Sequence, residues 1–155
     1  MKITLTILLG LLCTFQSYSC SCETVKEIND SVYINYPLII KGTVKKVEMV
    51  AEMQQEISIK VTILYNGEST DSILKVQGPV SGGACGLDVK EGEEWLFFAY
   101  NYKGHLETDL CTRSQNLSKK NRSIVYDIKV LEGDLKFLED NSGFWKRYFR
   151  KRKNK

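Results

Sequence analysis

Four cysteines have a spacing that suits either a disulfide framework or a metal site. Cys20 and Cys22 are one residue apart, and Cys85 and Cys111 stand alone further along the chain. A one-residue spacing is too short for the Cys-x-x-Cys pattern of zinc and redox sites. A bond between Cys20 and Cys22 would close a strained ring, so we expect each to bond elsewhere. One zinc ion bound by all four thiolates is the alternative.

The start of the chain indicates the compartment in which these cysteines lie. A basic residue and a short apolar run at 3–15 are followed by the small residues Ser17 and Ser19, directly before Cys20. This pattern predicts a signal peptide at 1–19, cleavage before Cys20, and a secreted or extracytoplasmic protein. The apolar run is shorter than the roughly 20 residues of a membrane span. Lipid attachment to Cys20, as in a lipoprotein, is the alternative, although Ser17 fits a lipobox poorly.

Export favours disulfides over zinc. The fifth cysteine, Cys13, is removed with the predicted signal peptide, which leaves an even number of cysteines. Even numbers in an exported domain are typical of disulfide frameworks, with three pairings available to four cysteines. Residues 20–155 suffice for one domain with its own core.

Alternating apolar residues predict the strands that must bring the cysteines together. The clearest strand is 56–65, in which one face carries Ile57, Ile59, Val61 and Ile63. Four more strands are expected, at 38–50, 72–77, 95–102 and 105–110. A bulge or a sharp coil of the strand is expected at Gly42. Cys85 then falls in a glycine-rich loop before the fourth strand, and Cys111 directly follows the fifth. Five successive strands with short turns favour a small antiparallel barrel.

Two helices are expected beside these strands. A short helix is predicted at 23–36. In the final third, apolar residues recur at helical spacing, at Leu117, Ile124, Ile128, Leu131, Leu135 and Leu138. Ser118 is expected to cap this second helix, and Gly133 to end or kink it.

Several segments together resemble a known family. They are the start Cys20-Ser21-Cys22, the strand LIIKGTV, the segment ACGLDVKEGEEWLFFA and the later LCTRSQNLS. In this order they resemble the netrin-like domain, the fold of the N-terminal domain of tissue inhibitors of metalloproteinases. The resemblance covers nearly all of residues 20–131. It implies a mainly β fold, a five-stranded OB-type Greek-key barrel with flanking helices. It also implies that the disulfides Cys20–Cys85 and Cys22–Cys111 staple the N-terminus to the barrel, within a domain at 20–143 that includes the C-terminal helix.

The resemblance also implies a function. Inhibitors of that family bind the catalytic zinc of a protease with the amino nitrogen and carbonyl oxygen of their first residue, a position matched by Cys20. Their small, hydroxylated second residue, matched by Ser21, points at a specificity pocket. We therefore predict a secreted metalloprotease inhibitor that contacts a zinc metalloendopeptidase through Cys20, Ser21 and Cys22. The chain lacks the inhibitors' His-Pro-Gln segment, third disulfide and C-terminal domain. A non-inhibitory module that binds another extracytoplasmic protein is therefore the alternative.

No other residues form a catalytic pattern. The chain has no nucleophile–base constellation or phosphate-binding loop, and its single histidine, His105, is expected at the surface. We therefore predict a monomer that is not an enzyme and uses no cofactor. The aromatic residues at 95–102 are expected in the core rather than in a nucleic-acid site. Asn29, Asn116 and Asn121 begin glycosylation sequons, which matter only in a eukaryotic secretory route.

The C-terminal end differs in charge from the rest of the chain. Residues 145–155 include seven basic and no acidic residues, whereas all 19 acidic residues lie before them. The acidic body argues against nucleic-acid binding. In the tail at 144–155, aromatic residues interleave with the cations, as in an interfacial anchor. We predict peripheral contact with an anionic membrane surface through Lys146, Arg147, Arg150, Lys151, Arg152 and Lys153. A disordered, solubilising terminus is the alternative.

Overall fold

The computed structural model describes residues 20–22, 25–69, 71–82, 85–118 and 128–153. The predicted signal peptide at 1–19 and the predicted helical positions at 119–127 lie outside these residues. So do the sequon asparagine Asn121 and the last two residues of the tail.

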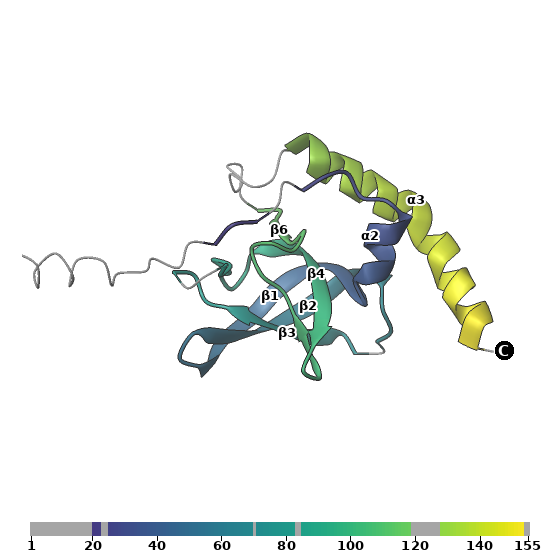
Figure 1. Cartoon of the computed structure of the whole chain (residues 1–155). Coiled ribbons are helices and arrows are strands. Elements are labelled where there is room, and N and C mark those ends of the chain that lie inside the picture. Colours follow the sequence, from purple (N-terminus) through teal and green to yellow (C-terminus); the bar gives the residue numbers. More distant parts are fainter. Residues whose placement is uncertain (1–19, 23–24, 70, 83–84, 119–127, 154–155) are drawn as a thin grey trace, which may run out of the picture.

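The strands form one sheet that closes into a ring (Figure 1). Its order is β1-β2-β3-β5-β4-β6, and β1 also pairs with β4. All pairings are antiparallel except that of β3 with β5, which is parallel and consists of Gln77 opposite Glu107. The strands are β1 (Leu38–Ala51), β2 (Gln54–Asn66), β3 (Ile73–Pro79), β4 (Glu94–Tyr102), β5 (His105–Glu107) and β6 (Gln115–Asn116). The mainly β prediction is confirmed, and β6 is a short sixth strand that the sequence pattern did not predict.

Strand β4 is buried on both faces and separates two parts of the core. Trp95 and Phe97 pack inside the ring, whereas Leu96 and Phe98 pack on the opposite side with residues of the helices. This division follows from the alternation of side chains along a strand. The predicted core role of the aromatic residues is confirmed for Trp95, Phe97 and Phe98, but Tyr102 at the strand end is 48% exposed.

Gly42 lies at an irregularity in the pairing of β1 with β2. Lys41 lies opposite Ile63 and Gly42 opposite Val61, so Thr62 has no residue opposite it. An extra residue of this kind reverses the alternation of side chains along the strand. Val61 therefore packs against the core, whereas Ile63 is 38% exposed. The predicted irregularity at Gly42 is confirmed as a bulge whose extra residue lies in the neighbouring strand β2, and the prediction that Ile63 faces the same way as Val61 is wrong.

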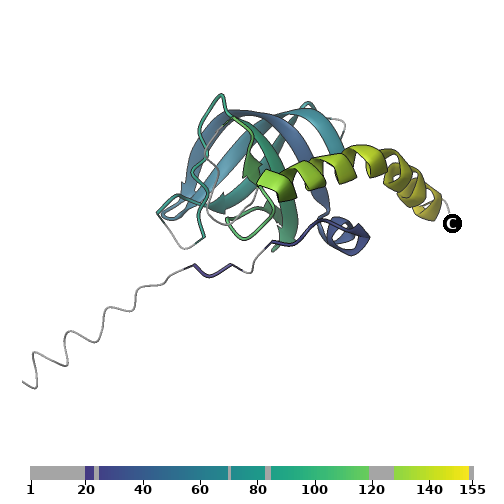
Figure 2. The ribbon, with the colours of Figure 1, turned by 90° about the horizontal axis from the view of Figure 1, so that it is seen from above.

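Two helices accompany the ring in the described part of the chain. Helix α2 (Asp30–Asn35) is shorter than the predicted helix and begins after Asn29, whose side chain accepts the Val32 N–H at 3.0 Å. Helix α3 (Ile128–Lys153) lies across the strands and continues beyond them (Figure 2). No helix in the described ranges is long and apolar enough to cross a membrane.

The predicted start of the second helix, with Ser118 as its cap, falls at residues 119–127, outside the described ranges. The Ser118 hydroxyl accepts the Glu94 N–H at 2.7 Å. Gly133 does not end the helix, which runs through it to Lys153. An interior glycine costs only about 1 kcal/mol. The burial of Leu131 and Leu138, each worth about 1.5–3 kcal/mol, outweighs that cost.

Two glycine substitutions test the description of α3 and of the bulge. Gly133→Ala should raise the free energy of unfolding by about 0.5–1 kcal/mol, because alanine favours the helix and the new Cβ would meet no atom within 4 Å. Gly42→Ala should lower it by about 1–3 kcal/mol, because its Cβ would lie 2.6 Å from both Ile59 Cγ2 and the Lys60 carbonyl oxygen. Urea unfolding of the oxidised proteins measures both effects. A neutral Gly42→Ala would contradict the close approach of β1 and β2.

Candidate functional site

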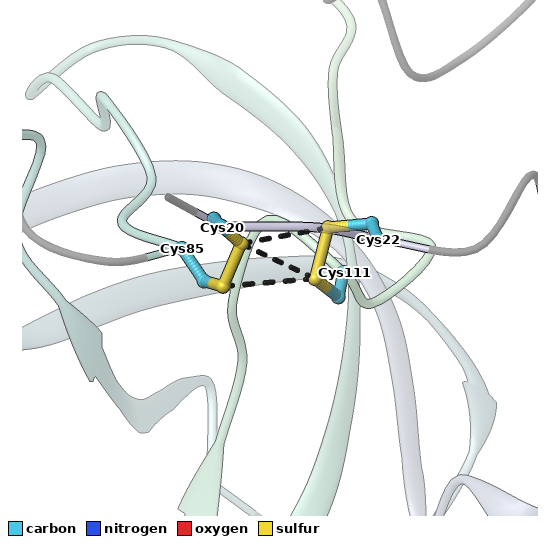
Figure 3. A group of neighbouring side chains, drawn as sticks. All are labelled: Cys20, Cys22, Cys85 and Cys111. Atoms are coloured by element: carbon cyan, nitrogen blue, oxygen red, sulfur yellow. Dashed lines mark hydrogen bonds between the residues drawn. A yellow bond between two sulfur atoms is a disulfide. The ribbon is translucent and has the colours of Figure 1, made fainter. Parts of the chain in front are cut away.

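Two disulfide bonds lie side by side at the beginning of the described chain (Figure 3). Cys20 bonds to Cys85 and Cys22 to Cys111, with Cα–Cα distances of 5.2 and 5.1 Å. These distances lie in the ordinary range for disulfides. The predicted pairing is confirmed, and the disulfides are consistent with an extracytoplasmic protein. The cysteines are 65 and 89 residues apart in the chain, so each bond stabilises the fold by about 4 kcal/mol in the chain-entropy model.

The four sulfur atoms form a single group. All lie within 4.8 Å of one another, and the sulfurs of Cys20 and Cys111, which are not bonded, are 3.5 Å apart. Among the residues that the structure describes, this is the only set of His, Cys, Asp and Glu side chains close enough to hold one metal ion. Zinc binds thiolates, and a sulfur in a disulfide is not a thiolate. The four sulfurs therefore serve either disulfides or a zinc ion, and here they form disulfides.

The glycine-rich loop shapes the chain around Cys85. Cys85 has a φ of 61°, in the left-handed region that residues other than glycine rarely adopt. The next residue, Gly86, packs directly against the carbonyl oxygen of Val80, where a side chain would not fit. The carbonyl of Cys85 accepts the Leu110 N–H at 2.8 Å, which sets the loop beside the segment that carries Cys111.

Asp109 holds the turn that carries Cys111. Its Oδ1 accepts the N–H groups of Cys111 and Thr112, each at 2.8 Å, and its Oδ2 accepts the Tyr100 hydroxyl at 3.0 Å. Burial, and then the charge of Asp109, raise the pKa of Tyr100, so its hydroxyl stays protonated and can donate. Sequence reasoning missed this residue. An aspartate that begins a turn and binds the following backbone N–H groups is the signal that could have identified it.

Three buried hydroxyls connect the same turn to β4. The oxygen of Thr108 lies 3.0 Å from that of Thr112 and 2.7 Å from that of Ser114. The Ser114 hydroxyl accepts the Phe98 N–H at 2.9 Å and donates to the Phe98 carbonyl at 3.2 Å. Buried polar groups need such partners, so this network favours one position of the turn against the sheet.

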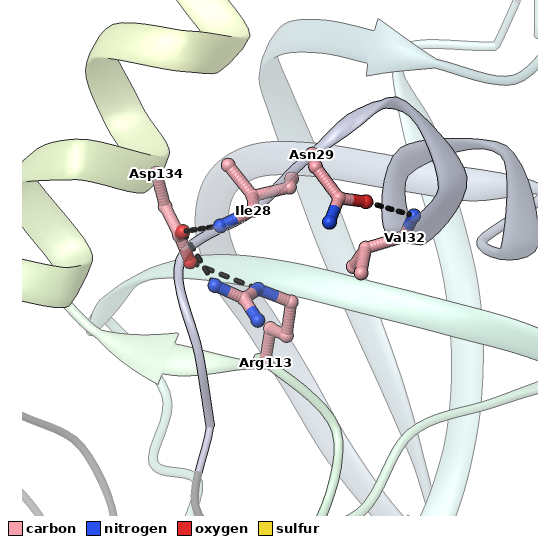
Figure 4. Close-up of polar contacts among 5 residues, drawn as sticks. All are labelled: Ile28, Asn29, Val32, Arg113 and Asp134. Carbon is pink, nitrogen blue, oxygen red and sulfur yellow. Dashed lines mark hydrogen bonds and ion pairs between the residues drawn. The ribbon is translucent and has the colours of Figure 1, made fainter.

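The N-terminal segment is held a second time at Ile28, by a carboxylate of α3 (Figure 4). Asp134 is fully buried, and its Oδ1 accepts the Ile28 N–H at 3.2 Å. Arg113 binds both oxygens of Asp134, through Nε at 3.0 Å and Nη2 at 2.5 Å. Because Arg113 follows Cys111 closely, one carboxylate joins α3, the N-terminal segment and the Cys111 turn. Sequence reasoning missed this contact too, although a charged residue within the apolar stripe of a helix is a recognisable signal.

The predicted contact residues lie together at the surface. Ser21 is exposed, whereas Cys20 and Cys22 on either side of it are half-buried. The backbone of this segment is therefore fixed by a covalent bond on each side of one accessible residue. The predicted cations of the tail are not near it, since Figures 1 and 2 show the end of α3 far from residues 20–22. His105 is exposed, as predicted, and the sequon residue Asn116 is buried in β6.

Comparisons with known proteins identify no family for the chain. No protein-family model matches the sequence, and no curated protein matches it. The order and flanking residues of the four cysteines remain the basis for the resemblance to netrin-like domains.

Single cysteine substitutions test the pairing. In Cys85→Ser, Cys20 should become the free thiol, because its partner is gone and the Cys22–Cys111 bond remains. In Cys111→Ser, Cys22 should become free instead. Alkylation followed by fragment mass spectrometry identifies the labelled cysteine in each variant. Label on Cys22 in Cys85→Ser would show that the pairing is exchanged.

The contact at Asp134 is tested by removing its charge. Asp134→Ala should lower the free energy of unfolding by about 3–5 kcal/mol, because the Arg113 charge loses its buried partner. The double variant Arg113→Met with Asp134→Leu should recover most of this loss, since neither charge then remains buried. Asp140→Ala removes an exposed carboxylate from the same helix and should change stability by less than about 0.5 kcal/mol. Equal losses in Asp134→Ala and Asp140→Ala would contradict the role of Asp134.

Proposed function

We propose that this chain is a secreted netrin-like domain that inhibits a zinc metalloendopeptidase through a mature N-terminus at Cys20. The observation that carries the proposal is the segment Cys20-Ser21-Cys22, held by a disulfide on each side of an exposed residue. The proposal rests on the resemblance to metalloprotease inhibitors, whose first residue has the same position relative to four ordered cysteines.

The fold proposed for the domain is an OB-type Greek-key barrel. Support comes from the closed strand order, in which β1 pairs with both β2 and β4 while β3 pairs with β5. OB barrels are five-stranded and partly open, and the single residue pair between β3 and β5 leaves little pairing there. Strand β6 would be an addition at the edge of β4.

The proposed chemistry needs only backbone atoms. After cleavage before Cys20, its amino nitrogen and carbonyl oxygen can bind one zinc ion together in a five-membered ring. The catalytic zinc ion of a protease keeps one coordination position for water and activates that water for attack on the peptide. When the amino nitrogen and carbonyl oxygen of Cys20 displace this water, the nucleophile of the reaction is removed. The disulfides hold both ligand atoms before binding, so little conformational entropy is lost when the complex forms.

The pairing also supports secretion over lipid attachment. The sulfur of Cys20 bonds to Cys85, and lipid attachment to Cys20 would use that same sulfur. The proposed mature protein therefore begins with an unmodified cysteine. Ser21, exposed beside the ligand atoms, is the proposed contact with the specificity pocket of the protease.

A second candidate is a netrin-like interaction module that inhibits nothing. One observation favours it. The end of the β1–β2 hairpin exposes Met49, Val50 and Met53, which are 61%, 49% and 52% exposed. Apolar side chains gathered at one exposed site are typical of protein-binding surfaces. Binding there would not require a free amino group at Cys20.

The chelation mechanism is tested by adding one alanine before Cys20. The extension converts the amino group to an amide and should abolish inhibition across a panel of zinc endopeptidases. Ser21→Gly is the matched control, and it should change affinity without abolishing inhibition because the backbone ligands remain. A free α-amino group has a pKa of about 7.7–8 and binds zinc only when unprotonated. Inhibition by the mature protein should therefore weaken as the pH falls below about 7.

Two outcomes would contradict the proposal. One is equal inhibition by the mature and extended proteins, because the amino group would then not be a ligand. The other is no inhibition by either protein, combined with capture of a partner that is lost when Met49 and Met53 are replaced by serine. The second outcome would support the interaction module.

A further inference from the structure

The sulfur atoms of the two disulfides have nearly the spacing of a tetrahedral metal site (Figure 3). A zinc ion bound by four thiolates at about 2.3 Å places every two sulfurs about 3.8 Å apart. In the oxidised protein the sulfur of Cys20 lies 3.7 Å from that of Cys22 and 3.5 Å from that of Cys111. The sulfurs of Cys85 and Cys111 are also 3.7 Å apart. Three edges of the zinc–sulfur tetrahedron are therefore present before any metal binds.

Opening the disulfides supplies the missing edges with short movements. Bonded sulfurs lie about 2 Å apart in any disulfide, so each must move by about 0.9 Å to reach the tetrahedral separation. Small rotations about the Cα–Cβ bonds move a sulfur this far without displacing the backbone. The one-residue spacing of Cys20 and Cys22 is shorter than the usual zinc pattern. It is nevertheless no obstacle, because the tertiary structure already brings their sulfurs to the required distance.

Two of the four cysteines are held together by contacts that do not involve sulfur. The carbonyl of Cys85 accepts the Leu110 N–H at 2.8 Å, which sets its loop against the following turn. In that turn, the Asp109 carboxylate accepts the Cys111 N–H at 2.8 Å. Because these hydrogen bonds are independent of the S–S bonds, Cys85 and Cys111 remain neighbours after reduction.

The N-terminal pair of cysteines is kept within reach by an anchor outside the disulfides. The Ile28 N–H donates to Asp134 at 3.2 Å, and Arg113 of the Cys111 turn binds the same carboxylate. Cys22 lies six residues before Ile28, and a chain of that length spans at most about 20 Å. Such a tether raises the effective concentration of the two N-terminal thiols at the loops.

The sulfur group is accessible from solvent. Cys111 is exposed, and the other three cysteines are half-buried. A reductant and a metal ion can therefore reach the sulfurs without opening the core. Zinc with four thiolates carries a net charge of −2, and an accessible site leaves that charge in contact with water, which avoids the large cost of burying it.

We propose that the reduced protein binds one zinc ion through the sulfurs of its four mature cysteines, Cys20, Cys22, Cys85 and Cys111. Two molecules of a dithiol reductant supply four electrons and four protons, break both S–S bonds and become disulfides themselves. The four thiols then release four protons and donate four electron pairs to zinc. In the reverse reaction, two molecules of a disulfide oxidant accept the four electrons with four protons, and the ion is released. Zinc thus fastens the N-terminal segment to the same two loops under reducing conditions.

The proposal is independent of protease inhibition. Inhibition would use the backbone nitrogen and oxygen of Cys20 on a zinc ion of another protein, whereas this site uses side-chain sulfurs of the reduced chain. One alanine added before Cys20 should abolish inhibition but change zinc binding less than about threefold, because all four sulfurs remain. The extended protein therefore distinguishes the failure of one proposal from the failure of the other.

Metal titration of the protein from Cys20 to Lys155 tests the proposal. This protein contains every described residue and excludes Cys13, so the four cysteines are its only thiols. It is reduced without oxygen by a phosphine, which is then removed, and titrated with cobalt(II) and then with zinc. We expect one ion per chain and the visible absorption of tetrahedral cobalt bound by four thiolates.

Zinc should also stabilise the reduced protein selectively. The midpoint of urea unfolding should rise by at least about 1 M when zinc is added to the reduced protein. Zinc should leave the midpoint of the oxidised protein unchanged, because sulfurs in a disulfide are not thiolate ligands. An equal shift in the two proteins, or no zinc binding by the reduced protein, would overturn the proposal.

Single substitutions test whether all four sulfurs bind one ion. Cys85→Ser and Cys111→Ser should each weaken zinc binding at least about tenfold and change the cobalt absorption, because one thiolate is lost. Ser81→Ala is the matched control, since it alters an exposed residue of the same glycine-rich loop and should change zinc binding less than about threefold. Unchanged affinity in Cys85→Ser would overturn the four-sulfur site.

Measurement in urea separates a folded site from four thiols on an unfolded chain, which also binds zinc. The reduced protein unfolded in urea should bind zinc at least about tenfold more weakly, because the contacts that hold the loops together are lost. Equal affinity of the folded and unfolded chains would overturn the proposal. So would a stoichiometry other than one ion per chain.

Discussion

Covalent attachment of the first described residues to two distant loops is the constraint on which the candidate site depends. Residues 20–22 belong to no strand or helix, so sheet or helix hydrogen bonds do not hold them. Because the two bonded cysteines flank a single residue, the disulfides fix both the position and the direction of the backbone. About 4 kcal/mol from each bond is large against the roughly 5–15 kcal/mol by which a domain is stable. The local turns at Cys85 and Cys111 position the two loops beside this segment.

The buried carboxylate of Asp134 adds a constraint of a different kind. Replacing a buried ion pair by apolar residues is often neutral for stability, so this pair is not needed for its net energy. Because an arginine and a backbone N–H must both reach the same carboxylate, few positions of α3 satisfy all of these contacts. The apolar contacts of α3 with the sheet supply the energy of packing, and Asp134 selects one register of the helix. The N-terminal segment and the Cys111 turn are thereby aligned with α3.

The proposed contact at the N-terminal segment has its own physical requirement. A rigid backbone and a small exposed residue suit a narrow site on another protein, because rigidity lowers the entropic cost of binding. Helix α3 is connected to this segment, since the first half of the helix contacts Ile28 through Asp134. The second half of the helix extends beyond the strands (Figure 1).

The sequence by itself determined the features that depend on local pattern. The pattern of apolar residues identified the five longer strands, and a glycine within a strand identified the bulge. The resemblance carried by the flanks of the four cysteines implied their pairing. Only the tertiary structure decided where Ile63 lies, because the unpaired residue at the bulge reverses the alternation after it. The same holds for the contact of Ser118 with strand β4, in which its hydroxyl accepts the Glu94 N–H. The contact of Ile28 with Asp134 spans 106 residues. A pattern within a few residues carries no information about which distant group will meet it, so packing of the whole chain decides such contacts.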